Sequence, residues 1–244
     1  MSMTIPDQDL RHSDWMAAAA EEYRRLGALL AELSDEEWHR PTDCSEWDVR
    51  EMVAHLVGAA EAGASVRELV HQALRGRRLR PGEPGVDGMN AVQVQERAAT
   101  SPDQLRRDLA AAGARGVRRR SGLPAFVRAL PIPFGPPLGT RPLGYLMDRI
   151  YTRDAWMHRI DLARATGRAL ELTGDHDGRI VADVVAEWAR AHGQPYRLTL
   201  TGPAGGSWSA GVDGEEISLD AVEFCRILSG RAAGTGPLAH AVPF

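Results

Sequence analysis

Two segments of the chain carry residues whose types and spacing suit metal chemistry. Asp154 and His158 lie four residues apart in the segment RDAWMHRID, and His55 lies far upstream in VAHLVG. On a helix, a spacing of four places both side chains on one face, one turn apart. A carboxylate and two imidazoles from two helices can hold a divalent metal ion and leave coordination positions open. The sequence therefore makes His55, Asp154 and His158 candidate metal ligands.

Each candidate also has an ordinary structural interpretation. A single histidine often only makes hydrogen bonds, and an acid–histidine pair four residues apart is common on helix surfaces. Asp161 follows His158 by three residues, so it could orient that imidazole or be a surface carboxylate. Glu51 precedes His55 by four residues and is an alternative ligand. Cys44 is interpreted as a small buried apolar residue.

The first 170 residues are helical in pattern, which indicates how the candidate ligands could meet. Apolar residues with a period near 3.6 predict four helical regions, at about residues 12–33, 46–74, 89–120 and 140–166. The second is expected to follow an N-cap at Ser45, the third to restart at Ser101, and the fourth to end at Gly167. Residues 121–140 hold five prolines and are expected to form a long irregular connection. Four such helices favour a bundle with the candidate site between facing helices.

The pattern changes after Gly167. A helix is expected at residues 177–192, strands at 196–201 and 207–209, and a hairpin turn at Asp213-Gly214. Ser218 is expected to cap a last helix that ends at Gly230. The predicted fold is mainly α: a four-helix bundle over residues 10–168, followed by a small α+β domain over residues 172–244.

Bulk composition narrows the functional class. The chain has 244 residues and a net charge of −4, which argues against a nucleic-acid binder. All 29 basic residues are arginines, and the cluster Arg118–Arg120 is interpreted as a solvated helix end. The two cysteines are far apart, so a disulfide framework is not expected. The sequence shows neither a signal-peptide pattern nor a membrane span, so we expect a cytoplasmic protein that does not bind membranes.

Both candidate metal segments resemble motifs of one family. The segment Pro41–Gly58, PTDCSEWDVREMVAHLVG, resembles the N-terminal motif of mycothiol-dependent maleylpyruvate isomerases, which belong to the DinB-like metal-binding helix bundles. Arg153–Asp161 resembles their second motif. The segments Leu198–Trp208 and Leu228–Arg231 are similar to their small C-terminal domain. The resemblance therefore spans nearly the whole chain.

The resemblance implies a zinc site at His55, Asp154 and His158, with mycothiol as the thiol cosubstrate. The family pattern has glutamate where this chain has Asp154, which makes this ligand one methylene shorter. Zinc can lower the pKa of a bound thiol. Addition of the thiolate to a cis double bond, rotation and elimination would give the trans isomer, and addition alone would give a thiol conjugate. The expected substrate is a small electrophilic molecule, with or without carboxyl groups.

The resemblance also implies that Arg231 assists substrate handling. A cation beside a glycine could hold a substrate carboxylate. From its position alone, just past a helix end, Arg231 is better interpreted as a partner of the helix dipole.

Two other functions are open from the residues alone. Two histidines and one carboxylate also suit iron(II) oxygen chemistry. A helical bundle with a small domain could instead enclose an apolar ligand without catalysis. Metal analysis and a His55→Ala variant would separate these alternatives from a zinc-dependent isomerase or thiol S-transferase.

Overall fold

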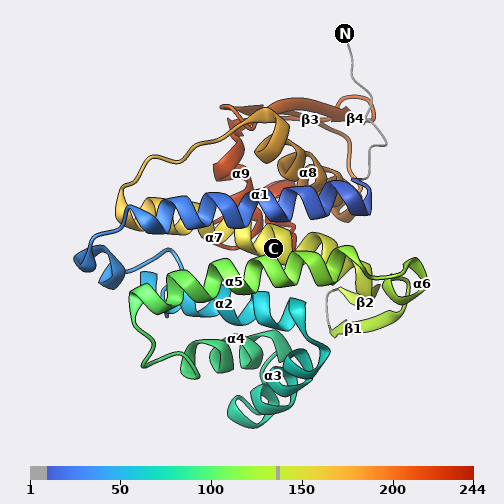
Figure 1. The fold of residues 1–244 in the computed structure, drawn as a ribbon. Coiled ribbons are helices and arrows are strands. Elements are labelled where there is room, and N and C mark those ends of the chain that lie inside the picture. The colour runs from blue at the N-terminus through green and yellow to red at the C-terminus, as the bar shows by residue number, and fades with distance from the viewer. Residues whose placement is uncertain (1–9, 136–137) are drawn as a thin grey trace. The chain divides into compact units, whose positions relative to one another are not determined.

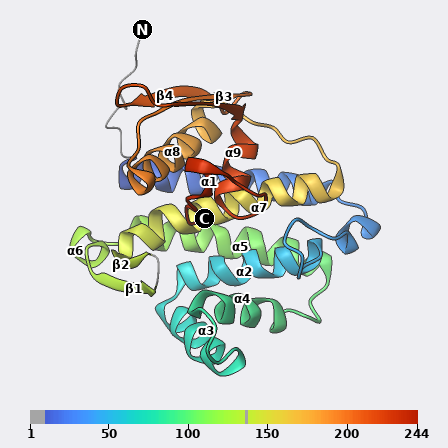
Figure 2. The ribbon, with the colours of Figure 1, turned by 180° about the vertical axis from the view of Figure 1, so that it is seen from behind.

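The computed structural model describes residues 10–135 and 138–244 and divides the chain into two compact units. The larger unit is His12–Ala169, and the smaller holds Leu170–Phe244 with residues 10 and 11. Figures 1 and 2 show both units from opposite sides, with the larger unit almost entirely helical. The predicted fold class, mainly α with a small α+β C-terminal part, is confirmed. Among the described residues, no helix combines the length and apolarity that a membrane span needs.

Four long helices form the larger unit: α1 (His12–Ala31), α2 (Val49–Ala64), α5 (Pro102–Ser121) and α7 (Tyr151–Thr166). Helices α1 and α2 each pack against both α5 and α7, which closes a four-helix ring. A short helix, η1 (Asp35–His39), follows α1. The largest fully buried side chains of this unit include Trp15, Leu26, Leu30, Trp38, Met52, Leu56 and Trp156.

The helix that carries His55 is shorter than predicted. It begins at Val49, and its N-cap is Asp48 rather than Ser45. The Asp48 side chain accepts a hydrogen bond from the Glu51 backbone, while the Glu51 carboxylate accepts one from the Asp48 backbone. This reciprocal capping box satisfies two amides that the helix start would leave unpaired. The chain then turns at Ser65, whose extended backbone separates α2 from α3 (Val66–Leu79).

Helix α4 (Gly85–Gln95) packs on α2 and α3. Glycines allow the close approach, because a Cβ at Gly76 would lie 2.5 Å from the backbone of Gly88. Helix α5 follows the predicted signals, with Ser101 as N-cap and Pro102 in the first turn. Helices α3 and α4 thus both pack against α2 (Figure 1).

The segment before α7 is a hairpin rather than an irregular connection. After α6 (Ala125–Arg128), strand β1 (Pro131–Gly135) pairs antiparallel with β2 (Gly139–Pro142); Pro136 and Pro137 lie outside the described residues. The predicted helix start near Thr140 is therefore wrong, because a residue before proline favours extended backbone and Pro142 cannot donate. A π-helical segment, η2 (Tyr145–Ile150), leads into α7. Gly167 ends α7 in the left-handed region, as predicted.

The smaller unit contains η3 (Gly174–Gly178), α8 (Arg179–His192), β3 (Tyr196–Thr201), β4 (Gly206–Ala210), β5 (Glu215–Asp220), α9 (Ala221–Leu228) and η4 (Gly236–Ala239). The sheet order is β4-β3-β5, with β4 antiparallel and β5 parallel to β3.

Two predictions for the smaller unit are wrong. Asp213-Gly214 is not a hairpin turn, because it joins β4 and β5, which lie on opposite sides of β3. Ser218 lies within β5, and Asp220 caps α9 instead, accepting from the backbones of Val222 and Glu223. Strand β5 was missed because most of its residues are exposed, so it has no continuous apolar pattern.

Candidate metal centre

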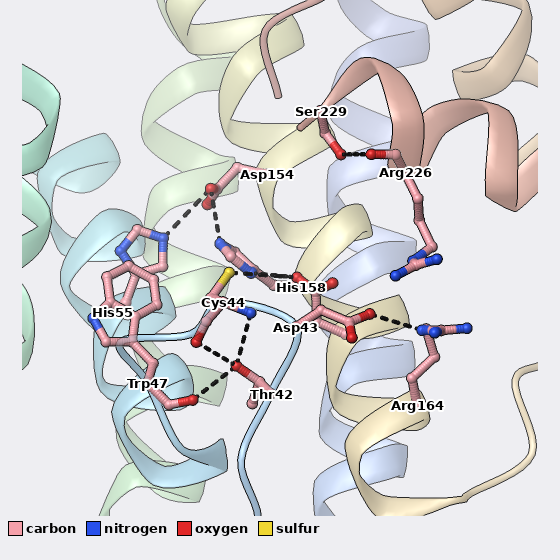
Figure 3. A network of polar contacts seen from close by, with 11 residues as sticks. Thr42, Asp43, Cys44, Trp47, His55, Asp154, His158, Arg164, Arg226 and Ser229 are labelled. Carbon is pink, nitrogen blue, oxygen red and sulfur yellow. Dashed lines mark hydrogen bonds and ion pairs between the residues drawn. The ribbon is translucent and has the colours of Figure 1, made fainter. Parts of the chain in front are cut away.

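His55, Asp154 and His158 meet inside the larger unit. One oxygen of Asp154, Oδ1, lies 3.4 Å from His55 Nε2 and 3.3 Å from His158 Nε2. The candidate ligand atoms of all three residues lie within 4.8 Å of one another. Figure 3 shows both imidazoles directed toward the Asp154 carboxylate, one from α2 and one from α7. The structure thus brings together residues that are 99 positions apart in the chain.

Burial and mutual attraction set the charges of this triad. The side chains of His55 and His158 are 4% and 7% exposed, whereas that of Asp154 is 19% exposed. Burial would raise the pKa of Asp154, but the two imidazoles hold it well below its usual range. Burial likewise would lower the pKa of His158, but Asp154 and further hydrogen bonds raise it well above its ordinary value. The carboxylate therefore stays ionised and attracts positive charge, whether from a proton or from a metal ion.

A relay of two buried glutamines holds the other nitrogen of His55. Nδ1 of His55 lies 2.7 Å from Oε1 of Gln93 on α4, and the Gln93 amide donates to Oε1 of Gln72 on α3. The Gln72 amide in turn donates to the carbonyl of Gly58 and the carboxylate of Glu68. Because the Gly58 carbonyl and the Glu68 carboxylate only accept, the amide nitrogen of Gln72 must face them and its oxygen must face Gln93. The orientation of both side-chain amides is therefore fixed. His55 Nδ1 must therefore carry a proton, and Nε2 is the nitrogen that faces Asp154.

A carboxylate holds the other nitrogen of His158. Nδ1 of His158 lies 3.0 Å from Oδ2 of Asp161, which is completely buried rather than on the surface. Hydrogen bonding to this acceptor keeps the proton on Nδ1 and directs Nε2 toward Asp154. Both imidazoles thus present the same nitrogen to the centre of the triad.

Cys44 lies close to this second support. Its Sγ is 4.0 Å from Asp161 Oδ2. The residue is half-buried, whereas a buried apolar residue was predicted from the sequence. Cys44, His158 and Asp161 form a second group with metal-ligand chemistry. That group is the weaker candidate, since the hydrogen bond between His158 Nδ1 and Asp161 already occupies the facing atoms.

The loop before α2 places an aromatic wall on the triad. The Thr42 hydroxyl donates to the carbonyl of Trp47, and the Trp47 backbone amide donates to Cys44. This tight turn sets the Trp47 ring on the imidazole of His55, with centroids 4.9 Å apart and planes 29° from parallel (Figure 3). The same ring lies 6.1 Å from His158. Trp47 therefore covers one side of both imidazoles.

The remaining sequence candidates lie elsewhere. Glu51 is not a ligand, because its carboxylate belongs to the capping box of α2. Arg231 is in the smaller unit, directly after Gly230, where its backbone amide donates to the carbonyl of Arg226. Its role in substrate handling stays a prediction.

Gln72 and Gln93 were missed by sequence reasoning. Glutamine is usually exposed, so nothing in the sequence distinguishes these two from surface residues. The sequence does hold one indication of these glutamines: Gly58, the last residue of the VAHLVG segment. A Cβ at Gly58 would lie 2.5 Å from the Gln93 side chain, so only glycine leaves room for the amide beside His55.

The donor set fits a divalent metal ion. Once their Nε2 atoms carry no proton, the two imidazoles and the ionised carboxylate are suitable ligands for zinc and for iron(II). The second nitrogen of each imidazole is held by an acceptor, as is usual for metal-binding histidines. Three protein ligands would leave coordination positions for a substrate or cosubstrate.

Comparison with known proteins identifies the family of the chain. The family described as "Mycothiol maleylpyruvate isomerase N-terminal domain" matches residues 19–163, more than half of the chain. The chain belongs to this family. The match includes the candidate ligands and their supports in the larger unit.

Solved structures of this family show the same fold. The chain aligns with a crystal structure of mycothiol-dependent maleylpyruvate isomerase at a TM-score of 0.61 and 17% identity, and with that of a variant at 0.62 and 19%. Each alignment covers 95% of this chain and 93% of the other. No curated protein matches the sequence.

Proposed function

We propose that this chain is a metal-dependent enzyme that uses mycothiol to isomerise the cis double bond of a small electrophilic acid such as maleylpyruvate. One observation carries the proposal: His55 and His158 both direct Nε2 at the partly exposed carboxylate of Asp154. Family membership supports the choice of thiol and substrate.

Each residue of the centre has a defined task in this proposal. His55, Asp154 and His158 hold the metal ion, which we propose to be zinc. When bound, zinc would lower the pKa of a coordinated thiol, so that thiolate is available at neutral pH. Gln93 and Asp161 keep each imidazole in the tautomer that binds metal. Trp47 covers His55 and excludes water from that side.

The reaction balances without a nucleophile from the protein. The thiolate adds to one carbon of the cis double bond, and the electron pair moves into the conjugated carbonyl as an enolate. The former double bond is now single and can rotate. Collapse of the enolate expels the thiolate and forms the trans double bond. Since the thiol is regenerated, catalytic amounts suffice, whereas S-transfer would consume one thiol for each product.

The proposal is tested with the full chain, loaded with zinc or stripped with a chelator. Maleylpyruvate is supplied with substoichiometric mycothiol, and both the trans product and the free thiol are measured. We expect many turnovers per thiol with zinc and none after stripping. Stoichiometric loss of thiol would indicate conjugation instead. Equal activity of the stripped protein would overturn the proposal.

A matched pair of histidine variants locates the activity. His55→Ala is expected to lower activity by roughly 100-fold or more, because it removes a metal ligand. His71→Ala is the control, since His71 also lies beside carboxylates, Glu68 and Glu96, but in a largely exposed group. Retained metal and activity in His55→Ala would place the site elsewhere.

A further inference from the structure

Arg120 is a buried cation without a hydrogen-bond partner on two of its nitrogens. It lies in the last turn of α5 and is 2% exposed, while its neighbours Arg118 and Arg119 are exposed. The interpretation of this cluster as a solvated helix end is therefore wrong for Arg120. Its Nε and Nη2 atoms make no hydrogen bond within the described residues. A buried guanidinium in this condition is costly unless an anion pairs with it.

Among the residues that the structure describes, none accepts a hydrogen bond from Nε or Nη2 of Arg120. Its guanidinium lies 5.8 Å from the ring centre of Tyr151, and Tyr23 is also within electrostatic reach. Burial raises the pKa of Tyr23 to about 12 and raises that of Tyr151 further, so both are neutral phenols at physiological pH. The nearby carboxylate of Asp148 is already engaged, by His12 at 3.0 Å and by Arg128 at 2.5 Å.

Arg120 faces the interior of the bundle that contains the metal centre. A Cβ at Gly63 on α2 would lie 3.7 Å from the Arg120 side chain and 3.8 Å from the Tyr151 ring. Gly63 is eight residues after His55 on α2, about 12 Å along the helix axis. Tyr151 precedes Asp154 by three residues on α7, so both lie on one face, a turn apart. The metal centre and the group around Arg120 therefore lie along the same inner faces of α2 and α7.

Small side chains connect these two groups along α2. On the face that continues from His55, the next positions are Ala59, Ala62 and Gly63. Ala59 and Ala62 pack with Tyr151 in one buried cluster. The Asp154 carboxylate also acts on Tyr23 and Tyr151, contributing to the raised pKa of each. A ligand that reached Arg120 would thus lie against apolar residues, where a charge pair is strong.

We propose that Arg120, with the phenols of Tyr23 and Tyr151, binds a carboxylate of the substrate whose double bond reacts at the metal centre. This subsite rests on the proposed function and assigns the substrate as an unsaturated acid. The guanidinium provides two parallel donors for a carboxylate, and each phenol can add one more. Selection for a carboxylated electrophile would then come from the bundle itself.

The first test measures binding without turnover. Glutarate, a saturated di-acid, is titrated calorimetrically into the full chain, as purified and after removal of metal, so that binding to a metal ion is distinguished. Arg120→Met is expected to weaken glutarate binding by roughly 30-fold or more, and Arg120→Lys by less, since lysine keeps the charge but loses the paired donors. Arg119→Met is the control and should bind as the parent does.

Two further measurements separate a subsite from a structural role. Removing an unpaired buried charge should leave the melting temperature of Arg120→Met unchanged or raised, whereas a structural arginine would lower it. With maleylpyruvate, Arg120→Met should raise KM, and Tyr151→Phe should raise it by a smaller factor.

The outcomes also distinguish this inference from the proposed function. Glutarate binding that depends on Arg120 in a protein without isomerase activity would support the subsite and reject the function. An active enzyme whose KM is unaffected by Arg120→Met would overturn the subsite. The subsite would also be overturned if chloride paired with Arg120 and glutarate bound equally well to Arg120→Met.

Discussion

The two imidazoles of the candidate metal centre meet the same carboxylate oxygen, but they are supported in different ways. On the α2 side, His55 donates to the neutral amide of Gln93, which depends on contacts with two further helices. On the α7 side, His158 donates to the charged carboxylate of Asp161, three residues along its own helix. One support is neutral and comes from distant parts of the chain, and the other is charged and local.

This difference assigns different roles to the two sides. A neutral amide can fix the tautomer and orientation of an imidazole but adds little charge. A buried carboxylate also favours the protonated imidazole and makes the ring a stronger metal ligand. In the proposed metal centre, we therefore expect the His158 side to set the metal affinity and its pH dependence, and the His55 side to set the geometry.

The largest effect is expected where the two sides meet. Asp154→Ala removes the carboxylate that faces both Nε2 atoms, so metal affinity should fall by more than about 100-fold. Competition with a chromogenic chelator measures this affinity. Asp103→Ala, which removes an exposed carboxylate, is the matched control and should not change it. Metal retained at full affinity in Asp154→Ala would show that Asp154 is not a ligand.

The next largest effect is expected on the charged side. Asp161→Asn keeps the shape of the support but removes its charge, so metal affinity should fall by roughly 10-fold to 100-fold. In the metal-free protein the pKa of His158 is raised, so a proton competes with metal and affinity should fall as the pH is lowered. The variant should shift this competition to lower pH, because its His158 holds the proton less tightly. An unchanged pH profile would show that Asp161 acts only as a structural acceptor.

A smaller effect is expected on the neutral side. Gln93→Leu removes the acceptor for His55 Nδ1, and metal affinity should fall by about 10-fold with little change in its pH profile. Gln93→Glu makes the His55 side resemble the His158 side, so it should restore affinity and make the pH dependence steeper. Gly58→Ala offers an independent disruption, because the added Cβ would displace the Gln93 side chain. If Gln93→Leu changed the pH profile as Asp161→Asn does, the division of roles would be wrong.

The support of His158 could be predicted from the sequence, whereas the support of His55 could not. Asp154, His158 and Asp161 follow one helical face, so their spacing alone predicts that they can interact. The partners of His55 depend on how α3 and α4 pack on α2, and that packing follows from glycine contacts which no local pattern reveals.

The burial of Arg120 within a run of three arginines could not be predicted from the sequence either. In Arg118–Arg120, three consecutive helical residues point in widely different directions, so periodicity of apolar residues did not show that one of them faces inward. The fold class was predictable because the long helices have strong apolar stripes, whereas strand β5 has only two apolar residues, Ile217 and Leu219.

The smallest effect is expected at Cys44, and it sharpens the distinction between support and catalysis. Its Sγ lies 4.0 Å from Oδ2 of Asp161, a weak contact that only supplements the support of His158 by Asp161. In the proposed reaction the attacking sulfur belongs to mycothiol, so Cys44→Ala should change isomerase activity by less than about fivefold. Cys225→Ala, at a buried cysteine of the smaller unit, controls for general loss of a thiol. Loss of activity in Cys44→Ala with metal retained would instead make Cys44 the nucleophile, oriented by Asp161 and His158, and the thiol cosubstrate would be unnecessary.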